Sequence, residues 1–136
     1  MNKVLITGGS GFIGTNLSIE LTKRGISNII TDTNKTEKKN YVRADVGNLR
    51  QLSEIFEKYG PFDYVFHLAA EYGRWNGEDF YEDLWQTNAV GTKNILRLQE
   101  KLKFKLIFFS SAEVYGDYDG EMNESIMIDN PIKDTY

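Results

Sequence analysis

A glycine-rich segment and the acidic residue that closes the next apolar run form the first candidate binding site. Residues 7–14 read TGGSGFIG and place Gly8, Gly11 and Gly14 between an apolar run and an amphipathic segment. At such a strand-to-helix turn, glycines let the backbone approach a pyrophosphate, which the free N–H groups of the helix start attract. Asp32 comes 18 positions after Gly14, where a carboxylate accepts hydrogen bonds from an adenosine ribose. The pattern predicts dinucleotide binding; a plain strand-to-helix turn is the alternative.

The charges near Asp32 bear on which dinucleotide is bound. A carboxylate at this position repels the extra ribose phosphate of NADP and accepts the free hydroxyl of NAD, so NAD is the predicted cofactor. Lys35, Lys38 and Lys39 follow in the next loop and would contact that phosphate in the NADP alternative. A lysine-rich loop is, however, more often a solvated surface.

A second group of candidate residues surrounds Ser111 and follows the fifth apolar run. Residues 109–116 read FSSAEVYG. Open parallel α/β sheets hold their chemistry beyond the carboxyl ends of the strands, which is where this segment is expected to lie. It carries the strongest catalytic signal in the chain, and Tyr136 follows Ser111 by 25 residues.

Alternating strand-like and helix-like segments position both groups of residues. Apolar runs predict strands over residues 3–7, 26–31, 41–44, 64–68 and 105–110, and periodic segments predict helices over 12–23, 49–58 and 80–101. This order predicts an α/β fold, a Rossmann-type doubly wound parallel sheet with helices on both faces. No helix follows the fifth strand, so its edge is expected to be exposed and the sheet incomplete at its C-terminal side. The alternative is a complete domain whose last twenty residues fold over that edge.

Composition excludes several classes of protein. The chain has 136 residues, 40% of them hydrophobic and 26% charged, as in one globular domain. It contains no cysteine, which excludes disulfides and thiolate metal sites. The net charge is −4 and no basic stripe is present, so nucleic acid is not an expected partner. No apolar run reaches the roughly 18 residues of a membrane span, so we expect a cytoplasmic protein without a membrane partner.

The chain resembles the extended short-chain dehydrogenase/reductase family, the nucleotide-sugar epimerases and dehydratases. The two-residue gaps between the glycines of TGGSGFIG are typical of that family, and the resemblance covers residues 1–136. It implies an NAD-binding domain over 1–136, with the C-terminal substrate domain absent from this chain. The cofactor-binding residues that it implies are Gly8, Gly11, Phe12, Ile13, Gly14, Asp32, Asp45, Val46, Leu68, Ala69, Ala70, Asn88 and Ser110.

Three of these residues have specific expected roles. By resemblance, Asp45 contacts the adenine with Val46 beside the ring, and Asn88 is the helix asparagine that steadies the sheet and the active site. A turn-forming aspartate and a surface asparagine are the alternatives. His67, the only histidine, is expected to be structural, because no other metal ligands cluster around it.

The resemblance also assigns catalytic roles. Ser111 matches the catalytic serine and Tyr136 the tyrosine that removes a proton from a sugar hydroxyl while hydride passes to the nicotinamide. The family's lysine, four residues beyond the tyrosine, is not in this sequence, so this chain alone is expected to be inactive. The 4,6-dehydratases carry an Asp-Glu pair where this chain has Ala112 and Glu113. A single carboxylate cannot hold both protonation roles, so epimerisation is the predicted reaction and Glu113 the third catalytic candidate. A glutamate bonded to the backbone is the alternative.

The function predicted for the full-length protein is therefore an NAD-dependent nucleotide-sugar epimerase. It would act through a keto-sugar intermediate on tightly bound NAD, as a homodimer that this chain alone forms weakly. A dehydratase, decarboxylase or reductase of the same family is one alternative. A non-catalytic NAD-binding regulatory module is another.

Overall fold

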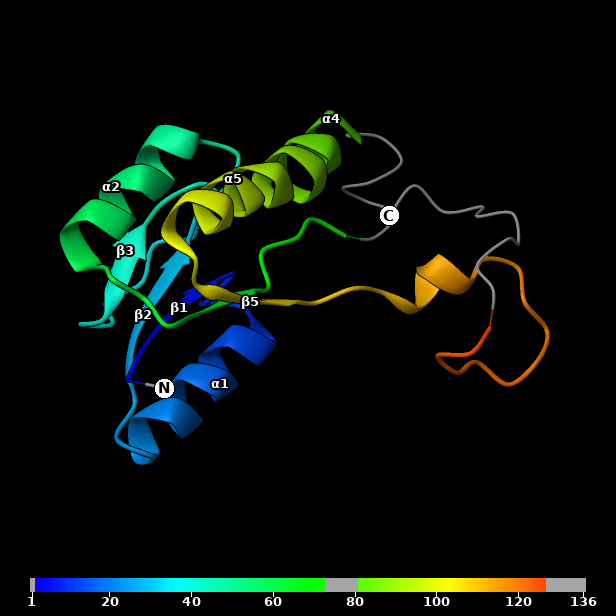
Figure 1. Ribbon diagram of the computed structural model, residues 1–136, viewed down its shortest axis with the longest axis horizontal. Coiled ribbons are helices and arrows are strands. Elements are labelled where there is room, and N and C mark those ends of the chain that lie inside the picture. Colours follow the sequence, from blue (N-terminus) through cyan, green and yellow to red (C-terminus); the bar gives the residue numbers. More distant parts are fainter. Residues whose placement is uncertain (1, 73–80, 127–136) are drawn as a thin grey trace.

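The computed structural model describes residues 2–72 and 81–126, and its centre is a five-stranded parallel sheet (Figure 1). The strands lie in the order β3-β2-β1-β4-β5. Their bounds are β1 (Lys3–Thr7), β2 (Ser27–Asp32), β3 (Tyr41–Arg43), β4 (Tyr64–His67) and β5 (Lys105–Phe108). The order reverses between β1 and β4, and in such sheets a ligand crevice forms beyond the carboxyl ends of the strands at that point. The predicted α/β Rossmann-type fold is confirmed.

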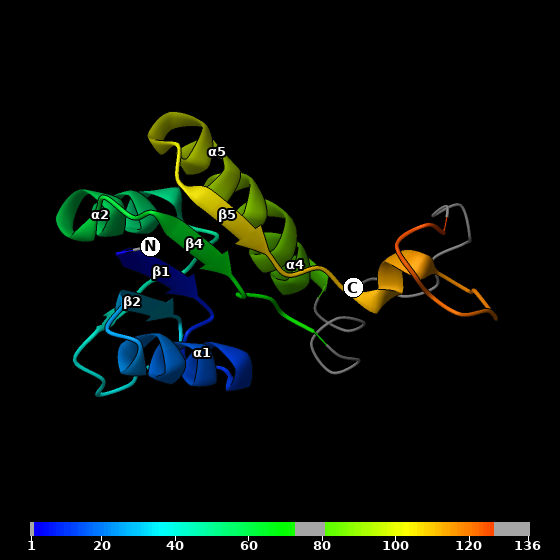
Figure 2. The same ribbon diagram turned by 60° about the horizontal axis from the view of Figure 1, so that its bottom comes forward.

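Helices cover both faces of the sheet (Figures 1 and 2). One face carries α1 (Phe12–Lys23), and the other carries α2 (Leu49–Tyr59) and α5 (Thr92–Leu102). Successive side chains of a strand point to opposite faces, so β1 contributes to both layers. Its Val4 and Ile6 belong to the buried cluster on the α1 side, and Leu5 to the cluster on the other side.

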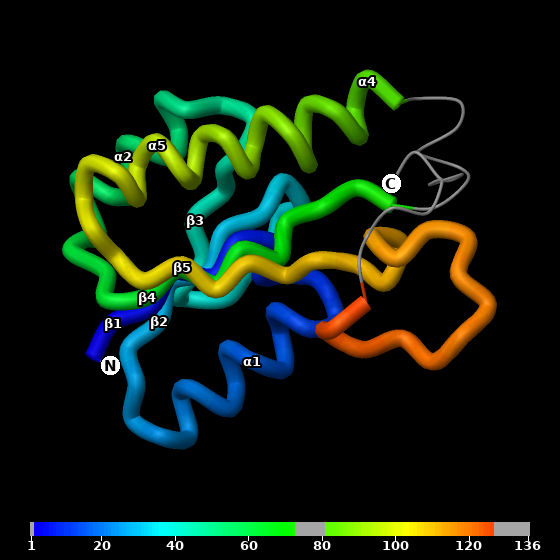
Figure 3. The backbone as a smooth tube through the Cα atoms, turned by 45° about the vertical axis from the view of Figure 1, so that its right-hand side comes forward, coloured from blue at the N-terminus to red at the C-terminus, as the bar shows by residue number. Residues whose placement is uncertain are grey.

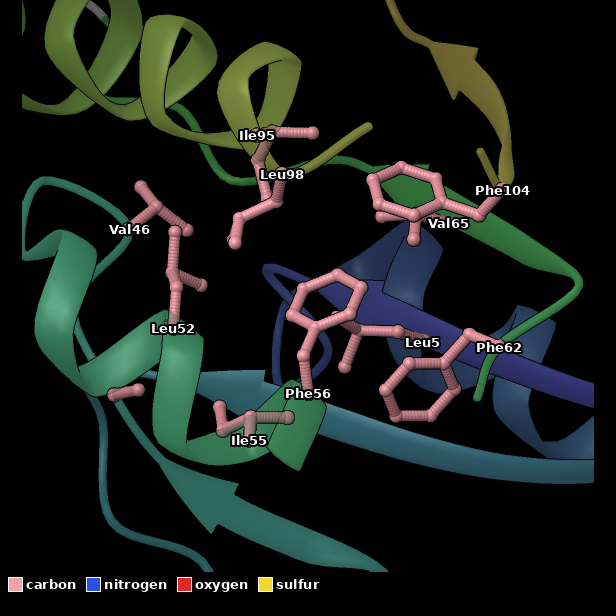
Figure 4. Packing of buried hydrophobic residues seen from close by; sticks show 11 residues of the cluster. Leu5, Val46, Leu52, Ile55, Phe56, Phe62, Val65, Ile95, Leu98 and Phe104 are labelled. Atoms are coloured by element: carbon pink, nitrogen blue, oxygen red, sulfur yellow. The ribbon is translucent and has the colours of Figure 1, made fainter. Parts of the chain in front are cut away.

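The larger buried cluster lies between the sheet and the helices α2 and α5 (Figure 4). The ring of Phe56 is central to it, with ring centroids 5.3 Å from Phe62 and 5.2 Å from Phe104. Asn48 caps the start of α2: its side chain accepts a hydrogen bond from the Gln51 N–H at 3.2 Å. The cluster includes Leu5 of β1 and Val65 of β4, each two residues before the carboxyl end of its strand.

The prediction of one continuous α-helix over residues 80–101 is wrong for its middle part. A short α4 (Tyr81–Leu84) leads into the π-helical η1 (Trp85–Gly91), which runs directly into α5. π-helical turns contain an additional residue. Gly91 packs so closely that a Cβ there would lie 2.6 Å from Val46 Cγ2. In the described ranges, no helix is both long and apolar enough to cross a membrane.

The predicted fifth strand ends two residues early, at Phe108 rather than residue 110. The chain then leaves the sheet and forms the short 3-10 helix η2 (Ala112–Tyr115). Residues 112–126 lie beyond the end of β5 and not along it (Figures 1 and 3). The described residues that follow β5 therefore leave its edge uncovered, and Phe108 is 53% exposed.

Candidate functional site

The carboxyl ends of the strands open into a cavity of about 1120 Å³ at the point where the strand order reverses. Every residue that the sequence analysis placed in the cofactor or catalytic site lines this cavity, with the exception of Tyr136. Tyr136 lies outside the described residues. The cavity therefore brings together the glycine-rich segment, the end of β2 and the segment that follows β5. Among the described residues, no group of histidine and acidic side chains is arranged to hold a metal ion.

The glycine-rich segment makes a turn that only small residues allow. Gly8 has a φ of 66°, and a Cβ there would lie 2.8 Å from the backbone of Leu68 and Ala69. A Cβ at Gly14 would lie 2.4 Å from the Gly8 carbonyl oxygen. No side chain caps the start of α1, so the N–H groups of its first turn remain available to an anion.

Gly9 is a residue of this turn that the sequence analysis did not assign. A Cβ at Gly9 would lie 2.4 Å from the Cβ of Ile30 on β2. In the sequence, the second of two consecutive glycines directly after the first predicted strand could have indicated this role. Gly9 therefore brings the turn against β2, next to Asp32.

The Asp32 carboxylate is held in position at the edge of the cavity by two backbone groups. Its Oδ2 accepts the N–H of Ser10 at 3.0 Å, and its Oδ1 accepts the N–H of Asn34 at 3.1 Å. Each carboxylate oxygen has a further lone pair. Asp32 can therefore accept hydrogen bonds from two hydroxyl groups of a bound ribose.

The turn that contains Asp45 is held from inside the protein. Asp45 Oδ1 accepts the Gly47 N–H at 2.8 Å, so this carboxylate shapes the turn while it also lines the cavity. Asn94, which is 3% exposed, donates to the carbonyls of Val46 and Gly47 at 3.0 Å each. Asn94 was not among the predicted site residues; it lies next to the apolar Ile95 in the helix predicted over residues 80–101.

Asn88 fixes the segment that follows β4. Its Oδ1 accepts the Glu71 N–H at 2.9 Å, and its Nδ2 donates to the Glu71 carbonyl at 2.9 Å. Both the oxygen and the nitrogen of the Asn88 amide therefore bond the backbone of a single residue, Glu71. This pairing fixes Glu71, which directly follows the cavity-lining residues 68–70.

Ser111 and Glu113 lie together at the other end of the cavity. The Ser111 Oγ accepts the Glu113 N–H at 3.2 Å and so caps η2. This contact uses a lone pair of the serine and leaves its hydroxyl hydrogen free to donate. The arrangement can offer one hydroxyl donor and one carboxylate to a bound molecule.

His67 closes β4 below the cavity and is 2% exposed. Its Nδ1 lies 2.7 Å from Thr7 Oγ1, and its Nε2 lies 3.1 Å from Thr92 Oγ1. Thr7 Oγ1 also accepts the N–H groups of Leu68 and Ala69, at 3.2 and 3.3 Å, so its own hydrogen is left to donate to Nδ1. This hydrogen-bond network assigns His67 as neutral, with its proton on Nε2.

The stability of the fold is expected to depend on the protonation of His67. Burial lowers the pKa of His67 from 6.5 to about 4. The unfolded chain therefore binds a proton first, and stability decreases by about 1.4 kcal/mol per pH unit as the pH falls from 6.5 towards 4. Urea unfolding should give a free energy about 2 kcal/mol lower at pH 5 than at pH 7.5.

A His67→Gln variant is the control for this pH dependence. The sequence has no other histidine, so the variant should be less stable at pH 7.5 but lose the slope between pH 5 and 6.5. If that slope persists in the variant, groups other than His67 cause it.

Replacing Thr31 by valine is expected to stabilise the protein. Thr31 is 0% exposed, and its Oγ1 has no hydrogen-bond partner among the described residues. Valine keeps the β-branched shape and removes the unpaired hydroxyl, so the free energy of unfolding should rise by about 1 kcal/mol.

Thr7 is the matched control for Thr31. It pairs with Thr31 across β1 and β2 and is also 0% exposed. Thr7→Val should destabilise by about 2 kcal/mol, because it removes three contacts of a bonded hydroxyl. An equal decrease in the free energy of unfolding in both variants would mean that the Thr31 hydroxyl forms a hydrogen bond in solution.

Comparison with known proteins relates this cavity to a family of enzymes. A sequence model of the NAD dependent epimerase/dehydratase family matches residues 4–135. UDP-N-acetyl-alpha-D-glucosaminuronate decarboxylase from Bacillus cytotoxicus is 40% identical over 121 aligned residues, which cover 84% of this chain and 38% of the relative. dTDP-glucose 4,6-dehydratase from Salmonella typhimurium is 31% identical over 152 aligned positions, which cover 93% of this chain and 42% of the relative.

The fold of this chain also matches a solved structure. UDP-glucose 4-epimerase from Brucella ovis in complex with NAD superimposes with a TM-score of 0.74 at 28% identity, over 85% of this chain and 38% of that one. The chain thus spans less than half the length of the proteins it matches. Because the family model covers nearly all of the sequence, this chain belongs to the NAD-dependent epimerase/dehydratase family.

Proposed function

We propose that this chain forms the NAD-binding part of a nucleotide-sugar epimerase. The observation that carries the proposal is the single cavity that contains the glycine-rich turn, Asp32, Ser111 and Glu113. Its two ends differ in chemistry, with anion-attracting N–H groups and a ribose-binding carboxylate at one end and a hydroxyl with a carboxylate at the other. A dinucleotide that extends between them would place its reactive end next to Ser111.

The residues of the cavity fit NAD. The first turn of α1 would hold the pyrophosphate, and Gly8 and Gly14 leave no side chain in its way. Asp32 would accept the adenosine ribose hydroxyls, and Val46 would lie beside the adenine. Lys38 donates to Thr15 Oγ1 at 3.1 Å and does not line the cavity, which supports NAD over NADP.

When bound, NAD would supply a hydride acceptor that later returns the hydride. The Ser111 hydroxyl would hydrogen-bond the sugar oxygen at the reacting carbon, and Tyr136 would take the proton from the same oxygen. A free tyrosine has a pKa near 10, so this role requires neighbouring positive charge that lowers its pKa by about three units, or about 4 kcal/mol. The whole protein would supply that charge from residues beyond this sequence.

Decarboxylation is a second candidate reaction, favoured by the 40% identity to a nucleotide-sugar decarboxylase. Oxidation of the sugar next to a carbon that bears a carboxylate gives a β-keto acid, which loses CO₂ to leave an enolate; a proton from solvent then replaces the carboxylate on that carbon. The same Ser111 and Tyr136 would serve the oxidation step. The two reactions would then share the oxidation step and differ in the substrate and in the steps that follow oxidation.

The whole protein is further proposed to be a homodimer that pairs through the helix containing Tyr81 and Trp85. These two residues are 58% and 66% exposed, and they lie four positions apart on consecutive helical segments, where a second copy of the protein would cover both. Light scattering of the native protein would test this. A monomer at micromolar concentration would contradict it.

The function is tested with the protein made from its native gene. The first assay titrates NAD by calorimetry into the protein freed of bound nucleotide; absence of NAD binding would overturn the proposal. The second incubates the protein with UDP-glucose, UDP-glucuronate and dTDP-glucose and identifies the products by NMR. An inverted hydroxyl with retained NAD supports the epimerase, and release of CO₂ supports the decarboxylase. Release of water would indicate a dehydratase, and stoichiometric oxidation of added NADH, in a parallel incubation, would indicate a reductase. Binding of NAD without any turnover would indicate a regulatory module.

A further inference from the structure

The backbone of residues 32–34, which carries Asp32, is held from β3 at each of its three carbonyl groups. The Tyr41 hydroxyl shares its single hydrogen between the Asp32 carbonyl, at 2.9 Å, and the Asn34 carbonyl, at 2.5 Å. The Asp32 carbonyl also accepts the Ala44 N–H at 3.1 Å. Between Asp32 and Asn34, the Thr33 carbonyl accepts the Arg43 Nε–H at 3.0 Å. β3 therefore fixes the path of this segment.

The segment held in this way faces the proposed ribose position, whereas the two side chains that hold it do not. Asp32, Thr33 and Asn34 line the cavity, and Tyr41 and Arg43 do not. Because the carbonyls are engaged by β3, the Asn34 N–H stays directed at the Asp32 carboxylate. Any effect of Tyr41 on a ligand must pass through this backbone.

The Tyr41 side chain is well placed to act as a fixed donor. Its ring packs against the buried cluster on the α1 side of the sheet, which positions the hydroxyl. Burial and the charge of Asp32 raise the pKa of Tyr41 above its ordinary value, so the hydroxyl keeps its proton at physiological pH. Both of its partners are carbonyl oxygens, which can only accept.

We propose that Tyr41 is a positioning residue for the adenosine end of the cofactor site. By clamping the backbone on both sides of Thr33, it keeps the Asp32 carboxylate where it binds ribose hydroxyls and repels a ribose phosphate. The proposal rests on the proposed function, because it assumes that Asp32 meets the adenosine ribose. It adds a residue that the cavity itself does not contain.

The test compares Tyr41→Phe with the unchanged protein made from its native gene, freed of bound nucleotide. Calorimetry measures the Kd for NAD, NADP, ADP-ribose and nicotinamide mononucleotide. We expect the Kd for NAD and for ADP-ribose to rise about fivefold, which corresponds to the loss of one hydrogen bond. The Kd for nicotinamide mononucleotide should not change, and the preference for NAD over NADP should decrease.

Tyr64→Phe is the matched control. Tyr64 packs against the same buried cluster, and its hydroxyl bonds no other group in the described part of the chain. This variant should bind all four nucleotides as the unchanged protein does. An equal loss for nicotinamide mononucleotide in Tyr41→Phe would show a general structural effect and overturn the proposal, as would an unchanged Kd for ADP-ribose.

Two further variants keep the test decisive. If Tyr41 acts through Asp32, then Tyr41→Phe in an Asp32→Asn background should produce no additional loss of ADP-ribose affinity. A full additional loss would overturn the proposal.

If Tyr41→Phe does not fold, Arg43→Gln takes its place. This variant removes the Arg43 donor to the Thr33 carbonyl and should raise the ADP-ribose Kd about twofold. An unchanged Kd there would also overturn the proposal. If the unchanged protein binds neither NAD nor ADP-ribose, the proposed function fails instead.

Discussion

Replacing Gly8 by alanine is expected to lower the affinity for NAD at least 100-fold and to destabilise the fold by about 3 kcal/mol. Gly8 combines a φ of 66° with a position where a Cβ would lie 2.8 Å from the backbone of Leu68 and Ala69. Backbone atoms cannot move aside as the end of a side chain can. The turn would have to move away from β4, and it would take the start of α1 with it.

Gly25→Ala separates the two causes of this effect. Gly25 has a similar φ of 72°, but a Cβ there would meet nothing within 4 Å. The variant therefore carries only the backbone strain, about 1 kcal/mol, and should bind NAD normally. Urea unfolding and calorimetry of both variants provide the measurements. Similar losses of stability in the two variants would show that φ alone matters, and normal NAD affinity in Gly8→Ala would remove Gly8 from the site.

The order of strands and helices was predictable because each buried strand of a parallel sheet leaves a short apolar run. The runs at residues 3–7 and 64–68 were bounded by glycine, proline or polar residues, and they appear as β1 and β4 within one residue. The position of the cavity followed from the same pattern, because parallel strands bring their carboxyl ends to one edge.

The π-helical η1 was not predictable from periodicity. A single additional residue per turn changes the spacing of Trp85–Gly91 too little to alter a pattern of apolar and polar residues. Its effect is visible only in three dimensions, where Asn88 meets Glu71 and Gly91 meets Val46. Both contacts involve segments far apart in the sequence.

Residues that support the site were harder to predict than residues that line it. Motif reasoning finds side chains that a ligand would touch, such as Asp32 and Ser111. Tyr41 and Asn94 hold backbone carbonyls, and any residue with a suitable donor at the right place can do that. The unpaired hydroxyl of Thr31 was equally unpredictable, because threonine in a strand usually finds a partner.

Ser111→Ala is expected to lower kcat of the whole enzyme about 100-fold while KM changes by less than about threefold. The Ser111 hydroxyl hydrogen is free to donate, since the Glu113 N–H occupies only a lone pair of the oxygen. In the proposed reaction that hydrogen would bond the sugar oxygen most strongly as the oxygen loses its proton. The loss therefore falls on the reacting state and spares the bound ground state.

Ser111 also caps η2, so a second variant must separate catalysis from structure. Ser111→Thr keeps both the hydroxyl donor and the acceptor for the Glu113 N–H, and it should retain kcat within about fivefold. If the alanine variant acted only by releasing η2, Glu113 would lose its position, and a raised KM would accompany the lower kcat. Steady-state kinetics on the preferred nucleotide sugar distinguish the two cases. Turnover of Ser111→Ala within fivefold of the unchanged enzyme would leave Ser111 as a cap and place the chemistry on other residues.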